Sequence, residues 1–171
     1  GSLHWILNMK VTRDRKNRTL WLDQSQSIKE FFQRHPVPSG RAVTSPMDTN
    51  WKYGSEPPTT SADRITNYRS RVGSLSYWSQ TTRPDIVYAV SCLSRHLAKP
   101  NTSCFNALDH LCRYVHTTQH LGLVFRGDPE GHTPSLHAYA DASWLGPDCA
   151  QAKSVTGSLI FYGRDLIDWK S

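Results

Sequence analysis

The chain has 171 residues, of which 37% are hydrophobic, and a formal net charge of +6 at pH 7. Six Trp, seven Tyr and five Phe supply large apolar side chains, which argues against a wholly disordered chain. No apolar run reaches the ~18 residues of a membrane helix, and His4, Asn8 and Lys10 interrupt the N-terminal stretch, so neither a membrane span nor a signal peptide is expected. The four cysteines form no CxxC pair, which predicts reduced thiols and an intracellular protein.

The N-terminal segment predicts a β-hairpin followed by an amphipathic helix. Apolar residues alternate over 4–11 as in a half-buried strand, and a polar tip at 13–18 separates this strand from a shorter one at 19–22. Ser27 and Glu30 then have the spacing of a capping box at the start of a helix.

A linker and a helical segment follow. Residues 36–61 hold five of the ten prolines, which is typical of a domain boundary or of a wrapping arm. Helical spacing of apolar residues then continues up to Thr82. It resumes from Pro84, which suits a first helical turn, and again after Asn101 or Thr102, either of which can cap a third helix.

The last segment changes to the spacing of strands, which are expected at 121–125, 136–142, 158–162 and 166–169. The predicted fold class is therefore α+β. Its expected organisation is a hairpin and helix at 1–35, a Pro/Ser/Thr-rich linker at 36–61, a helical segment at 62–120, and an incomplete sheet at 121–171.

The hairpin is a candidate nucleic-acid contact. Five cations fall within nine residues that contain one Asp, namely Lys10, Arg13, Arg15, Lys16 and Arg18. Trp5 and Trp21 lie at the far ends of the same hairpin, and cations beside aromatic rings suit a phosphate backbone. A solvated hairpin tip with no ligand explains the same pattern equally well.

Asp141 is a candidate metal ligand near the end of an apolar strand. A lone Asp in this position is usually a strand-end cap or a turn former. Two-metal cleavage of a phosphodiester needs several acidic ligands, and the spacing of Asp148, Asp165 and Asp168 indicates no such cluster.

Taken together, the motifs resemble the Pol polyproteins of copia-type retrotransposons. The pieces occur in the family's order and span essentially the whole chain. They are 1–11 with Leu20–Gln24, then Thr44-Ser45-Pro46-Met47, then Tyr68–Tyr77 with Thr82-Arg83-Pro84-Asp85-Ile86, and finally Tyr139–Trp144, Lys153–Gly157 and Trp169-Lys170-Ser171. The third piece is the most specific.

The resemblance implies the closing palm strands of a reverse transcriptase, its thumb and connection region, and the opening strands of a ribonuclease H domain. Asp141 matches the family's first ribonuclease H metal-binding Asp, and Lys153–Gly157 match its second-strand signature. The parent family uses Mg²⁺, but this chain is expected to bind no cofactor tightly.

Departures from the family's pattern predict that this chain is inactive on its own. The family's Tyr-Val-Asp-Asp type polymerase signature lies upstream, and this sequence contains no adjacent pair of Asp residues. The later ribonuclease H ligands would lie beyond Ser171. Ser143 stands where the family often has a second Asp, and Asn8 replaces a common Gly. A fragment, a decayed copy and a piece reused for another purpose all fit these departures.

Three functions follow from the resemblance. The favoured one is residual, weak binding of an RNA–DNA hybrid or duplex, and no membrane partner is expected. The second is a non-catalytic scaffold that binds a partner, with a second copy or another chain covering the incomplete sheet. The third is a ribonuclease H completed by another chain.

Overall fold

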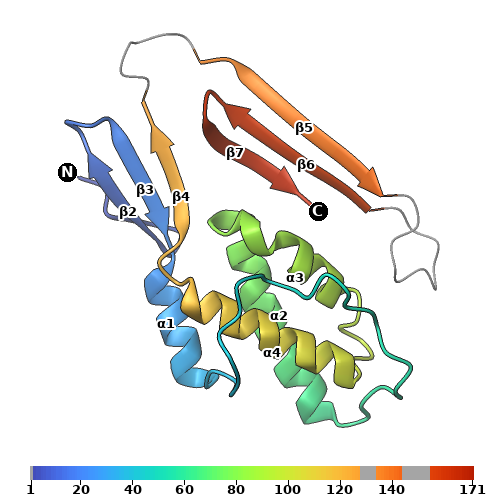
Figure 1. The fold of residues 1–171 in the computed structure, drawn as a ribbon. Coiled ribbons are helices and arrows are strands. Elements are labelled where there is room, and N and C mark those ends of the chain that lie inside the picture. Colours follow the sequence, from blue (N-terminus) through green and yellow to red (C-terminus); the bar gives the residue numbers. More distant parts are fainter. Residues whose placement is uncertain (1, 128–133, 144–154) are drawn as a thin grey trace. The chain divides into compact units, whose positions relative to one another are not determined.

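A computed structural model describes residues 2–127, 134–143 and 155–171 (Figure 1). The chain divides into two compact units, each treated by itself below. One unit comprises Gly1–Ser27 together with His120–Ser171, and the other is the continuous segment Ile28–Gln119. No described helix combines the length and apolarity needed to cross a bilayer.

The first unit contains an antiparallel sheet of four strands in the order β1-β2-β3-β4. Their bounds are Trp5–Ile6, Met9–Asp14, Thr19–Asp23 and Gly122–Arg126. The hairpin predicted for the N-terminal segment is therefore present as β2 and β3. Strand β4 pairs with β3 from almost one hundred residues further along the chain, with Gly122 opposite Asp23. A Cβ atom at Gly122 would collide with the backbone carbonyl of Leu22, so this close pairing requires glycine.

The single strand predicted over 4–11 is wrong, because a turn interrupts it in the middle. Leu7 and Asn8 have φ angles of 46° and 63°, and they form a two-residue turn between β1 and β2. Positive φ at both central residues is the pattern of a type I′ turn, which suits the twist of a tight hairpin. The turn folds β1 back onto β2, so that Trp5 pairs with Lys10.

A second antiparallel sheet in the same unit has three strands in the order β5-β6-β7. They span Leu136–Ser143, Val155–Tyr162 and Asp165–Lys170, which confirms the strands predicted for this part of the sequence. A register shift between Ile160 and Phe161 marks a bulge opposite β7. With two antiparallel sheets and segregated helices, the fold class is α+β as predicted.

The helical unit is built from segments with clear start signals. Helix α2 spans Ala62–Thr81 and α4 spans Thr102–Thr117, and Ser61 and Asn101 accept the N-cap hydrogen bonds. Between them lie the 3-10 turn η1 (Pro84–Ile86) and α3 (Val87–Ser94). Helix α1 spans Ser25–Arg34 and thus begins two residues before the predicted cap Ser27. At this observed start, Asp23 Oδ1 accepts a 3.1 Å bond from the Ser25 amide.

The continuous hydrophobic core lies in the helical unit, where Phe31, Tyr68, Trp78 and Leu111 are at most 2% exposed. The phenyl ring of Phe31 packs edge-on against Trp78, with ring centroids 5.2 Å apart. The proline-rich segment 36–61 runs along this core as an arm. Its attachments include side-chain to backbone bonds, from Trp51 Nε1 to the carbonyl of Ser103 and from Tyr53 Oη to the carbonyl of Lys99, and a backbone bond from Thr59 to the carbonyl of Pro100.

Candidate nucleic-acid interface

The tip of the β2–β3 hairpin is ordered by one carboxylate. Asp14 accepts a 3.1 Å bond from the backbone amide of Asn17 and a 2.6 Å bond from its side-chain Nδ2. These two bonds hold the pKa of Asp14 below its ordinary value, and the bond from the Asn17 backbone amide lowers it most. Arg18 takes a left-handed conformation with φ of 49°, and its carbonyl accepts a 2.8 Å bond from the amide of Gly127. The tip is therefore a defined loop that holds its cations in place.

One cavity beside the hairpin gathers arginines from separate elements. It has a volume of about 620 Å³ and is lined by Arg13 of β2, Arg15 and Arg18 of the tip, and Arg126 at the end of β4. Arg13, Leu20 and Phe125 lie opposite one another across β2, β3 and β4, so they share a sheet face. Apolar surface in the cavity comes from Leu20, Phe125, Tyr162 and Ile167.

A second cavity, of about 640 Å³, lies along the β1–β2 side of the same sheet. Its cations are Lys10, Arg13 and Arg15, and its aromatic side chain is Trp5. Trp5 is 50% exposed and is the cross-strand partner of Lys10. Trp5 and Lys10 are therefore adjacent on an accessible surface of the sheet.

The structure brings together most of the predicted binding residues, but not all of them. Lys16 lies at the exposed tip and lines neither of these two cavities. Arg126 was missed from the sequence, because only the pairing of Thr19 with Arg126 brings it to the hairpin. Trp21, which faces Thr12 and Val124 in the sheet, also lines neither cavity.

Two acids lie near the charge of this region, since Asp165 lines the four-arginine cavity and Asp23 is the cross-strand partner of Lys10. Among the described residues, none of Lys10, Arg13, Arg15 and Lys16 takes part in an ion pair. The sole acid of the hairpin tip, Asp14, is occupied by Asn17. The hairpin therefore presents available guanidinium and ammonium groups, which are the groups that bind phosphates.

Asp141 occupies β5 two residues before the strand ends, opposite Gly157 of β6, and it is exposed to solvent. Its neighbours on the same sheet face include Tyr139, two residues earlier in β5, and Leu159, the cross-strand partner of Tyr139, and neither offers a carboxylate. In the part of the chain that the structure describes, no group of three or more His, Cys, Asp or Glu residues could hold a metal ion. The described residues therefore do not fit the pair of Mg²⁺ ions that hybrid cleavage needs. The other acid considered at sequence level, Asp148, lies outside the described residues.

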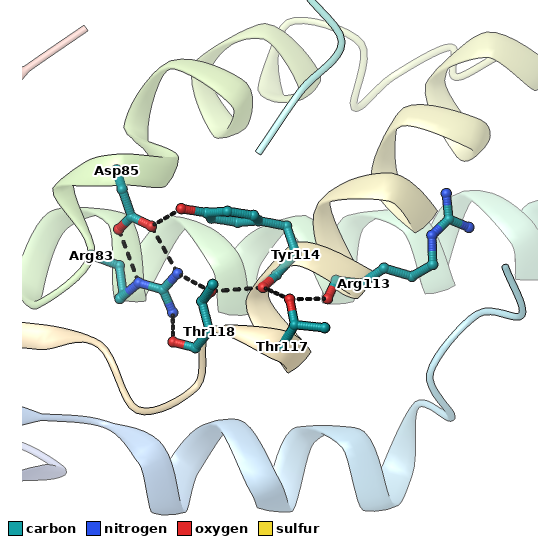
Figure 2. Close-up of polar contacts among 6 residues, drawn as sticks. All are labelled: Arg83, Asp85, Arg113, Tyr114, Thr117 and Thr118. Atoms are coloured by element: carbon teal, nitrogen blue, oxygen red, sulfur yellow. Dashed lines mark hydrogen bonds and ion pairs between the residues drawn. The ribbon is translucent and has the colours of Figure 1, made fainter. Parts of the chain in front are cut away.

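The most specific motif of the sequence, around Arg83, forms a buried polar network (Figure 2). The Arg83 side chain is 1% exposed and meets Asp85 with two bonds, Nε to Oδ1 at 2.9 Å and Nη2 to Oδ2 at 2.8 Å. It also donates to Thr118, from Nη1 to the carbonyl at 3.2 Å and from Nη2 to Oγ1 at 2.7 Å. Tyr114 Oη completes the network by donating to Asp85 Oδ2 at 2.9 Å.

This network joins three chain segments of the helical unit. Arg83 follows α2, Asp85 lies in η1, and Tyr114 and Thr118 belong to the end of α4 (Figure 2). Burial, followed by the nearby Asp85 charge, raises the pKa of Tyr114, so the phenol stays protonated and keeps donating. Because every partner lies within the protein, we interpret the motif as a structural clamp and not as a binding site.

Comparisons with known proteins give whole-chain matches. The chain is 34% identical over 176 residues to the "Retrovirus-related Pol polyprotein from transposon TNT 1-94" of Nicotiana tabacum, across 100% of this chain and 13% of that protein. It is 35% identical over 169 residues to the corresponding polyprotein from transposon RE1 of Arabidopsis thaliana, across 99% of this chain and 11% of that protein.

A third relative is much shorter. The "Secreted RxLR effector protein 161" of Plasmopara viticola is 35% identical over 104 residues, which is 61% of this chain and 70% of that protein. No family model matches the chain, and neither does any solved structure. The chain thus spans a small share of the two polyproteins but corresponds to most of the effector protein.

Proposed function

Because the chain belongs to the Pol polyproteins of copia-type retrotransposons, we propose that it is a non-catalytic piece of the reverse transcriptase and ribonuclease H region that binds nucleic acid. The ligand class is an RNA–DNA hybrid or duplex, bound weakly and without sequence preference. The binding surface is the basic hairpin of β2 and β3. The location is intracellular, which agrees with Cys92, Cys104 and Cys112 being buried and outside any disulfide among the described residues.

One observation carries this proposal, namely the four arginines that line a single cavity. Arg13, Arg15, Arg18 and Arg126 come from two strands and the hairpin tip, and the sheet pairing of β2, β3 and β4 brings them together. A planar guanidinium matches the geometry of a phosphate group better than an ammonium does. Several such groups around one concave surface suit a phosphate backbone better than they suit a solvated loop.

The test is the salt dependence of binding. Affinity for a labelled RNA–DNA hybrid, measured by fluorescence anisotropy between about 50 and 200 mM salt, should fall linearly on a double logarithmic plot. A triple variant with Arg15→Ala, Lys16→Ala and Arg18→Ala should flatten that slope by up to about three units. Arg126→Ala should flatten it by up to about one unit, although this residue lies far from the hairpin in sequence.

A matched control keeps the overall charge change the same. Arg34, Arg41 and Lys52 are exposed cations of the helical unit, and changing all three to Ala also removes three positive charges. This control should leave the salt slope within about half a unit of the parent value. Equal slopes for the hairpin variant and the parent would show that the hairpin is only a solvated tip.

The proposal includes the absence of polymerase activity. Nucleotidyl transfer needs carboxylates that hold metal ions against the triphosphate, and this sequence contains no two adjacent Asp residues. The purified chain should not extend a primer on a template when Mg²⁺ and nucleotides are supplied. Templated extension would contradict the placement of this chain outside the polymerase's catalytic segment.

A second candidate function, partner binding, is favoured by the exposed surface of the second sheet. Tyr139 and Leu159 are cross-strand partners that are 64% and 40% exposed, and β5 is an edge strand of this three-stranded sheet. An unpaired strand edge and exposed apolar side chains are surfaces on which another chain can bind. The effector relative, most of whose length is matched by this chain, supports a use of part of this chain outside a polymerase. Light scattering would show a dimer that Tyr139→Lys dissociates, whereas a monomer at all concentrations would contradict pairing with a second copy.

A further inference from the structure

The second cavity described above, which Trp5 lines together with Lys10, Arg13 and Arg15, is called the Trp5 cavity below. We propose that it holds an unpaired base of single-stranded nucleic acid. The base stacks on the indole of Trp5, and the neighbouring cations bind the adjoining phosphates. This inference rests on the proposed nucleic-acid binding and adds to it a preference for single strands. The site is distinct from the four-arginine cavity, although Arg13 and Arg15 line both cavities.

The first argument is the composition of the cavity. Trp5 is half exposed, and Lys10, Arg13 and Arg15 follow one another along β2 and into the hairpin tip. Strand side chains alternate between the two faces of a sheet, so Lys10 lies on the face of its partner Trp5 and Arg13 on the other face, although both line the cavity. An exposed ring in a cavity with several cations is the arrangement with which proteins bind single strands, because any base can stack and every nucleotide brings a phosphate.

The second argument is the turn that creates the cavity. Leu7 and Asn8 have φ angles of 46° and 63°, the left-handed conformation of a tight hairpin turn. The turn folds β1 over β2 and thereby places Trp5 beside Lys10. The position of the ring against the cations is therefore fixed by the backbone and not by a mobile loop.

The size of the cavity favours a single strand over a duplex. Its volume of about 640 Å³ lies within the range that small ligands occupy, roughly 300–1,000 Å³. One or two nucleotides are of this size, whereas the stacked bases of a duplex keep their faces away from any protein ring. A base must therefore leave its stack to reach Trp5.

A hydrophobic protein segment is the competing occupant, because the exposed side chain of Leu3 also lines this cavity. Lys10 counts against such a segment, since Lys is depleted at the centre of protein–protein contacts whereas Arg is common there. An apolar segment would also have to cover the cations of Arg13 and Arg15 without offering them a carboxylate, whereas a nucleic acid brings a phosphate with every nucleotide.

The experiment changes the ligand as well as the protein. The intact chain is titrated into three fluorescent probes of about twelve nucleotides, a length within the usual site size of single-strand binding proteins. The probes are oligo(dT), a backbone of the same length with abasic sites in place of bases, and a DNA duplex. Oligo(dT) should bind about 5- to 150-fold more tightly than the abasic probe, since stacking one base on an aromatic ring is worth that much.

Variants then assign the effect to one ring. Trp5→Ala should weaken oligo(dT) binding by the same factor and leave the abasic and duplex affinities within about twofold, while Trp5→Phe retains most of the affinity. Ile6→Ala is the matched control, because Ile6 is a neighbouring apolar residue of β1 that is 43% exposed. It should leave all three affinities unchanged.

The outcomes separate this inference from the proposal beneath it. Equal binding of oligo(dT) and the abasic probe would overturn the stacking site and leave phosphate binding intact. No binding of any probe would overturn the proposed nucleic-acid function itself. Loss of binding to all three probes in the folded Trp5→Ala variant would also overturn the inference, because it would assign Trp5 to the architecture of the hairpin.

Discussion

Arg83 and Asp85 are joined by two hydrogen bonds of 2.9 and 2.8 Å, one to each carboxylate oxygen, and their side chains differ in exposure, at 1% and 30%. Removal of Asp85 therefore leaves the positive charge of Arg83 inside the protein. Removal of Arg83 leaves the negative charge of Asp85, which still reaches water. Loss of Asp85 should therefore lower the free energy of unfolding more than loss of Arg83.

The first prediction follows from this inequality. Asp85→Ala should lower the free energy of unfolding by about 3 kcal/mol or more, because it strands the buried guanidinium of Arg83 and removes the acceptor of Tyr114. Asp109→Ala is the comparison, since it leaves the guanidinium of Arg71, whose side chain is 13% exposed where that of Arg83 is 1% exposed. That change should cost less than Asp85→Ala, because water still reaches part of the remaining charge. Urea denaturation monitored by circular dichroism measures both, and equal costs would contradict the clamp.

The second prediction concerns the strained turn between β1 and β2. Leu7→Asn should raise the free energy of unfolding by about 0.5–1 kcal/mol, because Asn tolerates the left-handed conformation better and Leu7 buries little surface. Leu3→Asn is a matched exposed substitution at a residue without positive φ, and it should give no gain. Thermal melts of both variants decide the point. A loss of stability in Leu7→Asn would show that Leu7 has packing that outweighs its strain.

The third prediction is the titration of Asp14. Its pKa should lie below 3.8, because the amide and side chain of Asn17 stabilise the carboxylate. A depressed carboxyl pKa contributes stability above the unfolded-state pKa, and this contribution disappears as the pH falls through the folded-state pKa. Asn17→Ala should raise the pKa toward 3.8, although the backbone bond remains. NMR titration of the carboxyl carbon measures both values, and an unchanged pKa would contradict the role of the Asn17 side chain.

The fourth prediction concerns Asp141. One exposed carboxylate binds Mg²⁺ weakly, because the ion prefers six oxygens and gives up its waters reluctantly. The intact chain and Asp141→Asn should both fail to cleave an RNA–DNA hybrid in millimolar Mg²⁺ or Mn²⁺. Cleavage by the intact chain that disappears in the variant would refute this prediction and show that a second chain supplies the missing ligands.

Local signals predicted most of the helices and strands. Ser61 and Asn101 mark the starts of α2 and α4 because a side-chain oxygen at the N-cap satisfies amides that the helix leaves free. The turn at Leu7 and Asn8 was missed because leucine is not a turn-forming residue. Its left-handed conformation is a compromise with the rest of the hairpin, which no propensity records.

The candidate site was predictable only in part, for a similar reason. Lys10 through Arg18 are close in sequence, so their charge is visible without a structure. Arg126 joins them through the pairing of β4 with β3, which depends on tertiary structure. For the motif around Arg83, the sequence indicated a family but not a role, since Thr118 lies 35 residues away.

The pairing of β3 with β4 also sets the order in which the chain folds. Asp23 and Gly122 are adjacent in the sheet, but the whole helical unit lies between them in sequence. Joining the ends of so long a flexible segment is entropically costly, whereas contacts between helices close in sequence form fast. We therefore expect the helices to collapse first and β4 to join the sheet last. Pulsed hydrogen exchange during refolding should protect the amides of α2 and α4 before those of β4, and the hairpin should gain Arg126 only in that final step.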